Sequence, residues 1–513
     1  MDWTAGYASD VEYVSGFYRE QSPHWLNLVC LLNGIAPVDI TESFHYCELG
    51  CGRGLTAQIL AAGNPQGQFY AADFNPSHVA GARALAAEAQ LSNLTLLENS
   101  FEELALGDVP LPQFDFITLH GIYTWITEDN QGHIVRFIKR YLKPGGLVYV
   151  SYNAQPGWSA VMPLQRLLIE HADLFPSRSD IQIKAATEFI NLLEANQAGY
   201  IVQNPGLSAR LNNLRTANPN YLVHEYMHRH WKPLFHADVA RHMSAAKLSY
   251  AGSADLTMTY PALCLDDARL KQLKQITAPE TQETVKDFFL NTAFRKDVFV
   301  RGPRRLTALR QAELLQQMAI VLSVPRDQAT NKLKLSIGEL VGREDLYSAV
   351  IDAIAEGPRT IQALAQLPAL AGQGIQSIAQ IAALLCASGQ AEFFFISNTA
   401  ASVEPAKIMN RTLATQTRYE DDHAALCSPL TGSGIVANYV ERLFYLSAAE
   451  NSEMPVPATL ARFAWQAMVE SGRYFHSGER IFQSEKENLT ELTVRAEAFI
   501  MKILPIWQTL KVI

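Results

Sequence analysis

Two patterns of apolar and polar positions alternate along the first part of this chain. From residue 44 to about 155, short and mostly apolar runs are followed by stretches in which apolar positions recur every three to four residues. The runs are typical of buried strands, and the wider spacing is typical of helices. Repeated strand–helix order of this kind predicts a doubly wound α/β sheet. We expect its strands at residues 44–49, 69–73, 94–99, 114–120 and 142–152.

The pattern is mainly helical outside this region. A helical lead-in is expected at residues 11–36, and C-terminal helices are expected near 459–471 and 489–503. Residues 346–396 give the order helix, short helix, helix, strand, which is typical of a winged-helix unit. A DNA-reading third helix would carry Arg or Lys, and residues 374–390 contain neither. We therefore interpret this unit as a protein-contact module.

A chain of 513 residues is expected to divide into about two to four domains. The fold class that we predict is α/β: a Rossmann-like domain followed by mainly helical, winged-helix-like and C-terminal domains. The expected boundaries are 1–165 for the Rossmann-like domain, 166–310 for a middle domain, 311–423 for the winged-helix-like module and 424–513 for the C-terminal helical domain.

The composition of the chain excludes several classes of protein. The net charge of −9 argues against a nucleic-acid binder, which would normally carry a basic face. The N-terminus lacks the basic and apolar regions of a signal peptide, and no apolar run is long enough for a membrane span. The six cysteines are scattered without a C-x-x-C pair, which favours free thiols over disulfides or zinc. We therefore expect a cytoplasmic protein.

The most informative stretch is HYCELGCGRG, residues 45–54. Glycines at 50, 52 and 54 follow the first expected strand and precede a helix, so the backbone can take positive φ values and approach a ligand closely. Asp73 ends the next expected strand, where folds of this kind bind a ribose. Position 55 is Leu, so the stretch is not the G-x-G-x-x-G of a dinucleotide site, and no Gly-Lys-Ser/Thr of a P-loop follows.

ELGCGRG with the later Asp73 resembles motifs I and II of class I S-adenosylmethionine-dependent methyltransferases. The resemblance implies that S-adenosyl-L-methionine is the cofactor. In that family a segment ahead of motif I commonly covers the cofactor, which gives Tyr13 and Tyr18 a possible role, and the residue at Asn99 is usually Asp. The cofactor-binding positions that the resemblance implies are Tyr18, Glu48, Gly50, Cys51, Gly52, Gly54, Asp73, Phe74, Asn99, Ser100, Phe101 and His120.

Aromatic and polar residues follow the fourth and fifth expected strands and are candidates for a substrate pocket. Tyr and Trp can pack on an alkyl chain, and their ring faces favour a cation. The alternative is that the tryptophans cover hydrophobic core. We predict that Tyr123, Trp125, Asn153 and Trp158 bind the substrate, and that the catalytic candidates are His120, Tyr123 and Tyr152. His120 and Tyr152 are both candidates for the general base.

Three further segments narrow the resemblance: LKPGGLVYVSYNAQPGW, HGIYTW and residues 221–254. They resemble methyltransferases that carry a methyltransferase regulatory domain, the family to which bacterial protein lysine methyltransferases belong. The resemblance implies methylation of protein lysines. The alternatives are a small-molecule O- or N-methyltransferase whose later domains form a lid and a dimer interface, and a cofactor-binding protein without turnover. A protein substrate and a possible homodimer are the expected partners.

His224-Glu225-Tyr226-Met227-His228 matches the H-E-x-x-H pattern of zinc peptidases. A catalytic zinc needs a third protein ligand, but the position for a third histidine, 234, is Leu, and Pro233 would end the helix first. We therefore predict no metal site.

Two expectations concern the later part of the chain. The basic residues of 294–310 are expected in a solvated loop or an anionic-partner patch. A cut near residue 165 is expected to leave cofactor binding largely intact and to remove substrate recognition.

Overall fold

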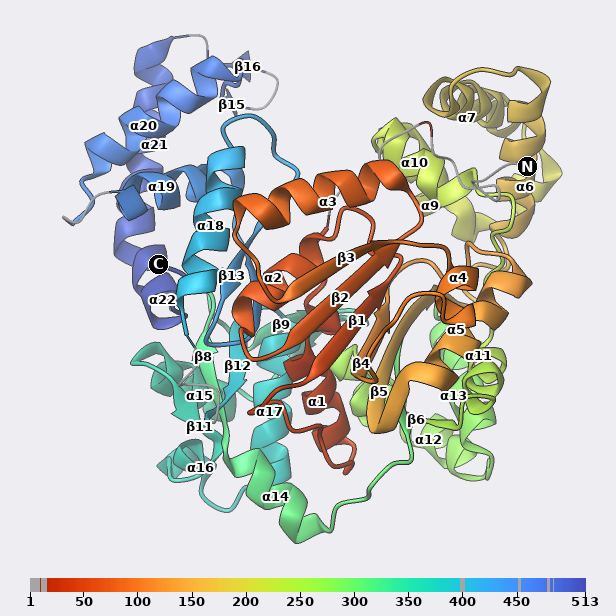
Figure 1. Ribbon diagram of the computed structural model, residues 1–513, viewed down its shortest axis with the longest axis horizontal. Coiled ribbons are helices and arrows are strands. Elements are labelled where there is room, and N and C mark those ends of the chain that lie inside the picture. The colour runs from red at the N-terminus through yellow and green to blue at the C-terminus, as the bar shows by residue number, and fades with distance from the viewer. Residues whose placement is uncertain (1–9, 11–15, 397–401, 451–453, 478–479, 483) are drawn as a thin grey trace.

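The computed structural model describes residues 10, 16–396, 402–450, 454–477, 480–482 and 484–513. Its centre is a twisted seven-stranded sheet in the order β3-β2-β1-β4-β5-β7-β6 (Figure 1). The first five strands are parallel. They confirm the strands predicted from the apolar runs: β1 (His45–Leu49), β2 (Gln68–Asp73), β3 (Leu94–Glu98), β4 (Phe114–Leu119) and β5 (Leu142–Asn153).

The helices that connect these strands begin at residues the sequence marks as caps. The side chain of Asn75 caps α3 (Pro76–Glu88), and Ser100 forms a reciprocal capping box with Glu103 in α4 (Phe101–Leu106). Thr127 caps α5 (Glu128–Tyr141), so this helix starts earlier than its apolar pattern suggests. The remaining helix, α2 (Leu55–Gly63), follows the glycine turn directly.

The sheet is completed by two strands from much later in the chain. β6 (Leu248–Ser253) and β7 (Phe294–Arg301) pair antiparallel with each other, and β7 also pairs antiparallel with β5. The predicted boundary at residue 165 therefore does not coincide with the end of the sheet. The expected loop at 294–310 is corrected as well, because its first half forms β7 and its charged residues alternate between the two faces of a strand.

A helical lobe is inserted between β5 and β6 and lies at the upper right of Figure 1. It has its own apolar core, which includes Leu168, Leu211 and Tyr226. Its elements are α6 (Met162–Leu174), α7 (Ser179–Ala195), α8 (Gly199–Gln203), η2 (Pro205–Leu207), α9 (Ser208–Thr216) and α10 (Pro219–Tyr226). The chain then runs through α11 (His236–Ser244), η3 (Leu256–Thr259), η4 (Pro261–Leu263), α12 (Asp267–Lys274) and α13 (Pro279–Leu290).

After α14 (Ala308–Gln316) the chain forms a winged-helix-like module, residues 318–395. The predicted order is confirmed by α15 (Glu344–Ala355), α16 (Ile361–Leu364), α17 (Ile375–Ala387) and β12 (Ala391–Phe395). β8 (Met318–Leu322) lies between β12 and β11 (Arg359–Thr360), and a hairpin of β9 (Lys332–Leu335) and β10 (Gly338–Val341) precedes α15. η5 (Pro368–Leu370) links α16 to α17.

The third helix of this module, α17, is largely buried. It packs in the same apolar core as α1 (Pro23–Leu32), which the short η1 (Arg19–Gln21) precedes. A helix held in this way inside the protein cannot enter a DNA groove, which agrees with the absence of Arg and Lys from it.

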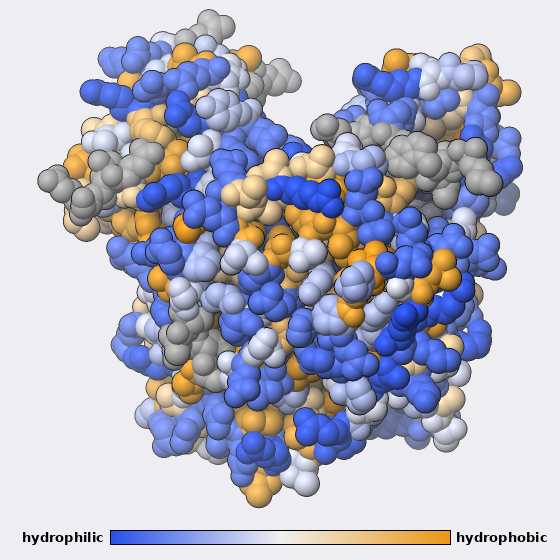
Figure 2. All heavy atoms as spheres, viewed as in Figure 1, coloured by the Kyte–Doolittle hydropathy of each residue, from blue (hydrophilic) through white to orange (hydrophobic). Residues whose placement is uncertain are grey.

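A C-terminal helical lobe lies at the upper left of Figure 1. It contains α18 (Glu404–Gln416), α19 (Tyr439–Glu450), α20 (Pro457–Glu470), α21 (Glu485–Ala498), a π-helical turn (Phe499–Ile503) and α22 (Leu504–Thr509). Its strands are β13 (Ala425–Ser428), β14 (Ser433–Val436), β15 (His476–Ser477) and β16 (Arg480–Ile481). Figure 2 shows the outline of the molecule hollowed between this lobe and the inserted helical lobe. No described helix is long and apolar enough to cross a membrane.

Candidate active site

The glycine turn lies at the carboxyl end of β1. Gly50, Gly52 and Gly54 all have positive φ values, of +67°, +55° and +71°, a conformation that L-residues with a side chain rarely adopt. The amides of Gly50 and Cys51 donate to the carbonyl of Ala72, at 2.8 and 3.0 Å, which fastens the turn to β2. A Cβ atom at Gly52 would meet nothing within 4 Å, so the backbone there is open to a close ligand.

Asp73, at the end of β2, lies directly against this turn. Its Oδ2 accepts from the amide of Gly52 at 2.8 Å, and its Oδ1 accepts from the amide of Asn75 at 2.9 Å. Each carboxylate oxygen has two lone pairs, so both oxygens can accept a further bond from a ligand hydroxyl. The two halves of the predicted fingerprint are thus in direct contact.

Glu48 is the buried acid of the site. Its Oε1 accepts from Gln21 Nε2 at 3.2 Å, and its Oε2 has no hydrogen-bond partner among the described residues. Burial, with a smaller contribution from Asp73, raises the pKa of Glu48 to about 8. A buried acceptor of this kind fits the positively charged amino group of an amino-acid ligand such as the methionine part of S-adenosylmethionine.

The segment of residues 16–22, which we call the strap, crosses the carboxyl edge of the sheet. The Tyr18 amide donates to Thr56 Oγ1 at 3.2 Å, and the Tyr18 ring stacks on His120 with 3.7 Å between centroids. Glu20 forms an ion pair with Lys296 of β7 at 2.6 Å. The strap therefore covers the site where a lid was expected. Tyr13, the other predicted lid residue, lies outside the described residues.

The strap also reaches the later modules. Arg19 donates to the carbonyl of Cys386 at 2.9 Å and pairs with Glu392 at 3.4 Å, both in the winged-helix-like module. Ser22 Oγ donates to the carbonyl of Gly432, in the C-terminal lobe, at 3.3 Å.

His120 follows β4 and is neutral at physiological pH. Burial lowers its pKa to about 3, although Glu20 opposes the shift. Its Nδ1 lies 2.8 Å from the hydroxyl of Tyr149 in β5. Ser151, on the same face of β5, accepts from the amide of Gly121 at 2.8 Å. Strand alternation places Asn153 on this face too; it is buried and its Nδ2 has no hydrogen-bond partner among the described residues.

The other cofactor candidates lie at the carboxyl ends of β2 and β3. The Asn99 amide donates to the carbonyl of Asp73 at 3.2 Å. Ser100 caps α4, and Phe101 and Phe74 are half-buried. Cys51 is half-buried beside Asp73, which together with burial raises the pKa of its thiol. All the predicted cofactor positions thus border one edge of the sheet; their individual roles stay predictions.

Two of the three catalytic candidates lie elsewhere. Tyr152 is fully buried on the opposite face of β5, where its hydroxyl donates to Asp297 at 2.6 Å. Tyr123 is also fully buried, with its hydroxyl 3.1 Å from His242 Nδ1. Their side chains pack in the apolar core between the sheet and α11. Of the predicted catalytic residues, only His120 faces the cofactor edge.

The tryptophans predicted to bind substrate form an aromatic cluster that is part of the apolar core of the inserted helical lobe. Trp125 stacks on Trp231 with 5.8 Å between ring centroids, and Trp158 meets Trp231 edge-on at 5.0 Å. The buried Trp158 donates its indole N–H to the carbonyl of Ala293 at 2.7 Å. Trp158 therefore lies in covered core, which favours the alternative for this residue, while Trp125 stays half-buried at the margin of the cluster; substrate binding by either residue stays a prediction.

Several residues of the site are not predicted from the sequence, among them Glu20, Gln21 and Lys296. Lys296 was part of the expected basic loop, but alternation along β7 separates it from Arg295. Arg295 is buried on the other face and pairs with Glu283, Asp287 and Asp297. Only the strand assignment of 294–301 could have revealed this division.

The H-E-x-x-H segment does not form the helix that a zinc peptidase needs. α10 ends at Tyr226, so His228 lies beyond the helix that carries His224. No group of three or more His, Cys, Asp or Glu suited to a metal occurs in the part of the chain that the structure describes.

We expect protein purified without chelators to contain far less than one equivalent of zinc, because His224 and His228 belong to no group of three possible metal ligands among the described residues. Elemental analysis of the wild type and of His224→Ala measures this. One tightly held zinc in the wild type that is lost from His224→Ala would contradict the prediction.

Comparisons with known proteins agree with this geometry. A family described as "Methyltransferase domain" matches residues 40–230, and one described as "Predicted methyltransferase regulatory domain" matches 218–301. An uncharacterized protein of Synechocystis sp. is 37% identical over 509 residues, covering 99% of this chain and 99% of the relative. The structure of PKMT2 from Rickettsia typhi in complex with AdoHcy superposes with a TM-score of 0.70 at 17% identity, covering 96% of this chain and 99% of that one.

A shorter match is a tRNA (guanine-N(7)-)-methyltransferase of Serratia proteamaculans, 30% identical over 131 residues, which are 23% of this chain and 55% of the relative. The sheet order, the glycine turn and Asp73 define a class I S-adenosylmethionine-dependent methyltransferase. The chain belongs to the same family as its full-length Synechocystis relative, and it contains both the methyltransferase domain and the methyltransferase regulatory domain. The regulatory domain supplies β6 and β7, so it is part of the catalytic sheet.

Cofactor binding is expected to release a proton from Glu48. Without ligand the raised pKa of about 8 keeps the carboxyl protonated at pH 7, and a cationic amino group would lower that pKa. Binding should therefore tighten as pH rises from about 6 to about 8, by up to ~10-fold per pH unit. Calorimetry in buffers of different ionisation enthalpy measures the proton release.

In Glu48→Gln the proton release should vanish and affinity should fall roughly 10- to 150-fold, the scale of a hydrogen bond to a charged group. Glu42→Gln, at an exposed position just before β1, is the control. Unchanged proton release in Glu48→Gln would exclude Glu48 as its source.

Proposed function

We propose that this enzyme transfers methyl groups from S-adenosylmethionine to lysine side chains of protein substrates. The observation that carries the proposal is the end-to-end similarity to PKMT2 of Rickettsia typhi, a protein lysine methyltransferase. That similarity covers the helical, winged-helix-like and C-terminal parts as well as the catalytic sheet. An enzyme for a small acceptor needs only a pocket of ~300–1,000 Å³, whereas accessory modules of this extent suit a large substrate.

The residues at the cofactor edge suit transfer to an amine. When bound, S-adenosylmethionine supplies a methyl group that is attached to a sulfonium sulfur. The rest of the cofactor then leaves as a neutral thioether. The lysine amine must be uncharged to attack, and the Tyr18–His120 stack offers a desolvated surface that lowers an amine pKa. His120 is neutral, and its Nδ1 is engaged by Tyr149, so Nε2 is the nitrogen left to face the amine.

Asn153 is the second residue that we expect to contact the protein substrate that receives the methyl group. Its buried Nδ2 has no partner among the described residues, so it needs an acceptor atom from a ligand. A peptide carbonyl next to the modified lysine meets this need. We assign His120 and Asn153 to positioning the acceptor, and the strap to excluding water.

Other properties complete the proposal. The net charge and the buried α17 support a protein partner over a nucleic acid. All six cysteines are free, which supports a reducing, cytoplasmic location. The possible homodimer stays a prediction.

The test is incubation of full-length enzyme with labelled S-adenosylmethionine and a whole-cell or surface-protein extract, followed by mass mapping. We expect label on lysine residues of protein. Asp73→Ala, which should lose cofactor affinity, is the background control. Label confined to small molecules would favour the small-molecule O- or N-methyltransferase instead, and label confined to RNA would contradict the proposed protein substrate.

A further inference from the structure

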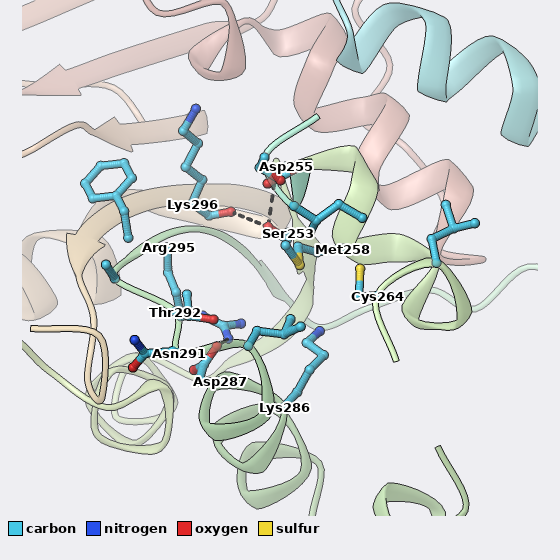
Figure 3. Close-up of a pocket in the computed structure, with 16 residues that line it drawn as sticks. Ser253, Asp255, Met258, Cys264, Lys286, Asp287, Asn291, Thr292, Arg295 and Lys296 are labelled. Atoms are coloured by element: carbon cyan, nitrogen blue, oxygen red, sulfur yellow. Dashed lines mark hydrogen bonds and ion pairs between the residues drawn. The ribbon is translucent and has the colours of Figure 1, made fainter. Parts of the chain in front are cut away.

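A cavity of about 620 Å³ lies beside the first residues of β7 (Figure 3). Its walls come from the end of β6 with η3, from the C-terminal part of α13 and the loop after it, and from the tip of the β9–β10 hairpin. This volume lies within the ~300–1,000 Å³ range of ligand pockets. The cavity is separate from the glycine turn, and none of the predicted site residues lines it.

The cavity borders the cofactor edge of the sheet. β7 runs antiparallel to β5, so its first residue, Phe294, pairs with Asn153 at the carboxyl end of β5. The Phe294 ring lies 6.1 Å from the His120 ring, and Lys296 reaches across to Glu20. Phe294 and Lys296 therefore form a wall with His120 and the strap on one side and the cavity on the other. Ligands of α/β sheets bind outside the carboxyl ends of the strands, where both spaces lie.

The basic residues around the cavity are already neutralised by acids. Lys286 pairs with Glu283 at 2.7 Å, Lys296 pairs with Glu20, and the guanidinium of Arg295 pairs with three carboxylates. One of those carboxylates belongs to Asp287, the second acid of the lining.

Asp255 is the lining acid without a basic partner in the described part of the chain. Its Oδ1 accepts only from the amide of Thr257, at 3.1 Å, and the side chain is half-buried. The three cations are outnumbered by their four carboxylate partners, Glu20, Glu283, Asp287 and Asp297, so Asp255 adds a negative charge that no nearby cation offsets in the described part of the chain. A half-buried carboxylate is weakly screened and attracts a cationic group.

One wall of the cavity belongs to the winged-helix-like module. Ser336 and Ile337 form the two-residue connection of the β9–β10 hairpin, whose flanking residues Leu335 and Gly338 pair with each other. Ile337 is half-buried, so the tip offers an apolar surface opposite the charged wall. A ligand in the cavity would thus touch both the catalytic sheet and the accessory module.

We infer that this cavity is a docking subsite for a basic side chain of the acceptor protein, close in sequence to the lysine that is methylated. Asp255 binds the cationic end of that side chain, and Ile337 packs on its aliphatic part. The modified amine lies on the His120 side of the Phe294–Lys296 wall. The inference rests on the proposed function and assigns to the winged-helix-like module a part in choosing the acceptor.

The test uses full-length enzyme and synthetic peptides that contain one acceptor lysine. A few residues away, the peptides carry Arg, Ala or Glu. We expect KM to be lowest for the Arg peptide and roughly 5- to 10-fold higher for the Ala peptide, the scale of one half-buried ion pair. In Asp255→Asn this difference should disappear while cofactor affinity stays unchanged. Asn retains the hydrogen bond to Thr257, so the substitution removes only the charge.

Four further variants sharpen the result. Asp255→Lys should reverse the preference and favour the Glu peptide. Ile337→Ser should raise KM for the Arg peptide and leave KM for the Ala peptide unchanged, whereas Val341→Ser, at an exposed position on the same hairpin, should change neither. Asp266→Asn is the matched control for Asp255, because Asp266 caps a neighbouring helix in the same way and does not line the cavity.

The outcomes separate the two proposals. Peptides methylated without regard to the neighbouring charge, or a preference that survives in Asp255→Asn, would overturn the docking subsite and leave the proposed function standing. Proteins methylated in an extract while no peptide is modified would also overturn it. Absence of lysine methylation in both peptides and extract would instead contradict the proposed function.

Discussion

Asp73→Ala is expected to weaken cofactor binding by ~1.5–3 kcal/mol, or roughly 10- to 150-fold in Kd. Both oxygens of Asp73 already accept backbone amides, from Gly52 and Asn75, so the carboxylate is held against the glycine turn and each oxygen keeps a lone pair. The substitution therefore removes the ribose acceptor and loosens the turn. Titration calorimetry with S-adenosylmethionine or its demethylated product measures the loss.

A cofactor analogue without the ribose hydroxyls separates these two effects. It should bind the wild type more weakly than the natural cofactor does, but Asp73→Ala should bind both equally. Asp115→Ala is the matched control, because Asp115 also accepts a backbone amide, from His45, at the far end of the same sheet. Unchanged affinity in Asp73→Ala, or an undiminished preference for the hydroxyls, would exclude Asp73 from ribose binding.

The second large effect is expected from truncation after residue 165, and it reverses the expectation from sequence. The fragment would lack β6 and β7 and the ion pair between Glu20 and Lys296. It would also expose the buried face of α1, where Trp25 donates its indole N–H to the carbonyl of Ala254 at 2.7 Å. We expect no cooperative unfolding transition and no measurable cofactor binding.

Circular dichroism during heating and calorimetry with the cofactor test this expectation. Full-length Lys296→Ala is the matched comparison, because it removes the ion pair with Glu20 of the strap but leaves every strand in place. It should fold and bind the cofactor more weakly than the wild type. A fragment 1–165 that binds the cofactor as tightly as the full chain would show that the later strands do not support the site.

Sequence predicts well those parts of the fold that are determined by residues close together in the chain, such as apolar runs and helix caps. Parallel strands buried on both faces read as apolar runs, and the caps at Asn75, Ser100 and Thr127 mark helix starts within one turn. The glycine turn and Asp73 were found because their chemistry depends on residue type and spacing. Their contact in the structure follows from the pairing of β1 with β2.

What sequence could not predict depends on strand register and on distant partners. Tyr152 and Asn153 are neighbours at the end of β5, and only the register decides that Asn153 faces the site while Tyr152 faces Asp297. β7 was missed because its buried charges make it read as polar. Arg295 lies inside the protein only because three acids, two of them on α13, surround it.

The position of β7 between β5 and β6 also governs how the enzyme can be made. On the ribosome, β5 is complete about 150 residues before β7 emerges, a delay of roughly 8–30 s at ~5–20 residues per second. Throughout that time β5 lacks its partner along one edge, so the nascent chain presents the long, mostly apolar edge of Leu147–Asn153, which is a template for pairing with other chains. Production of this methyltransferase should therefore depend on chaperones that cover β5 until Arg301 has left the exit tunnel.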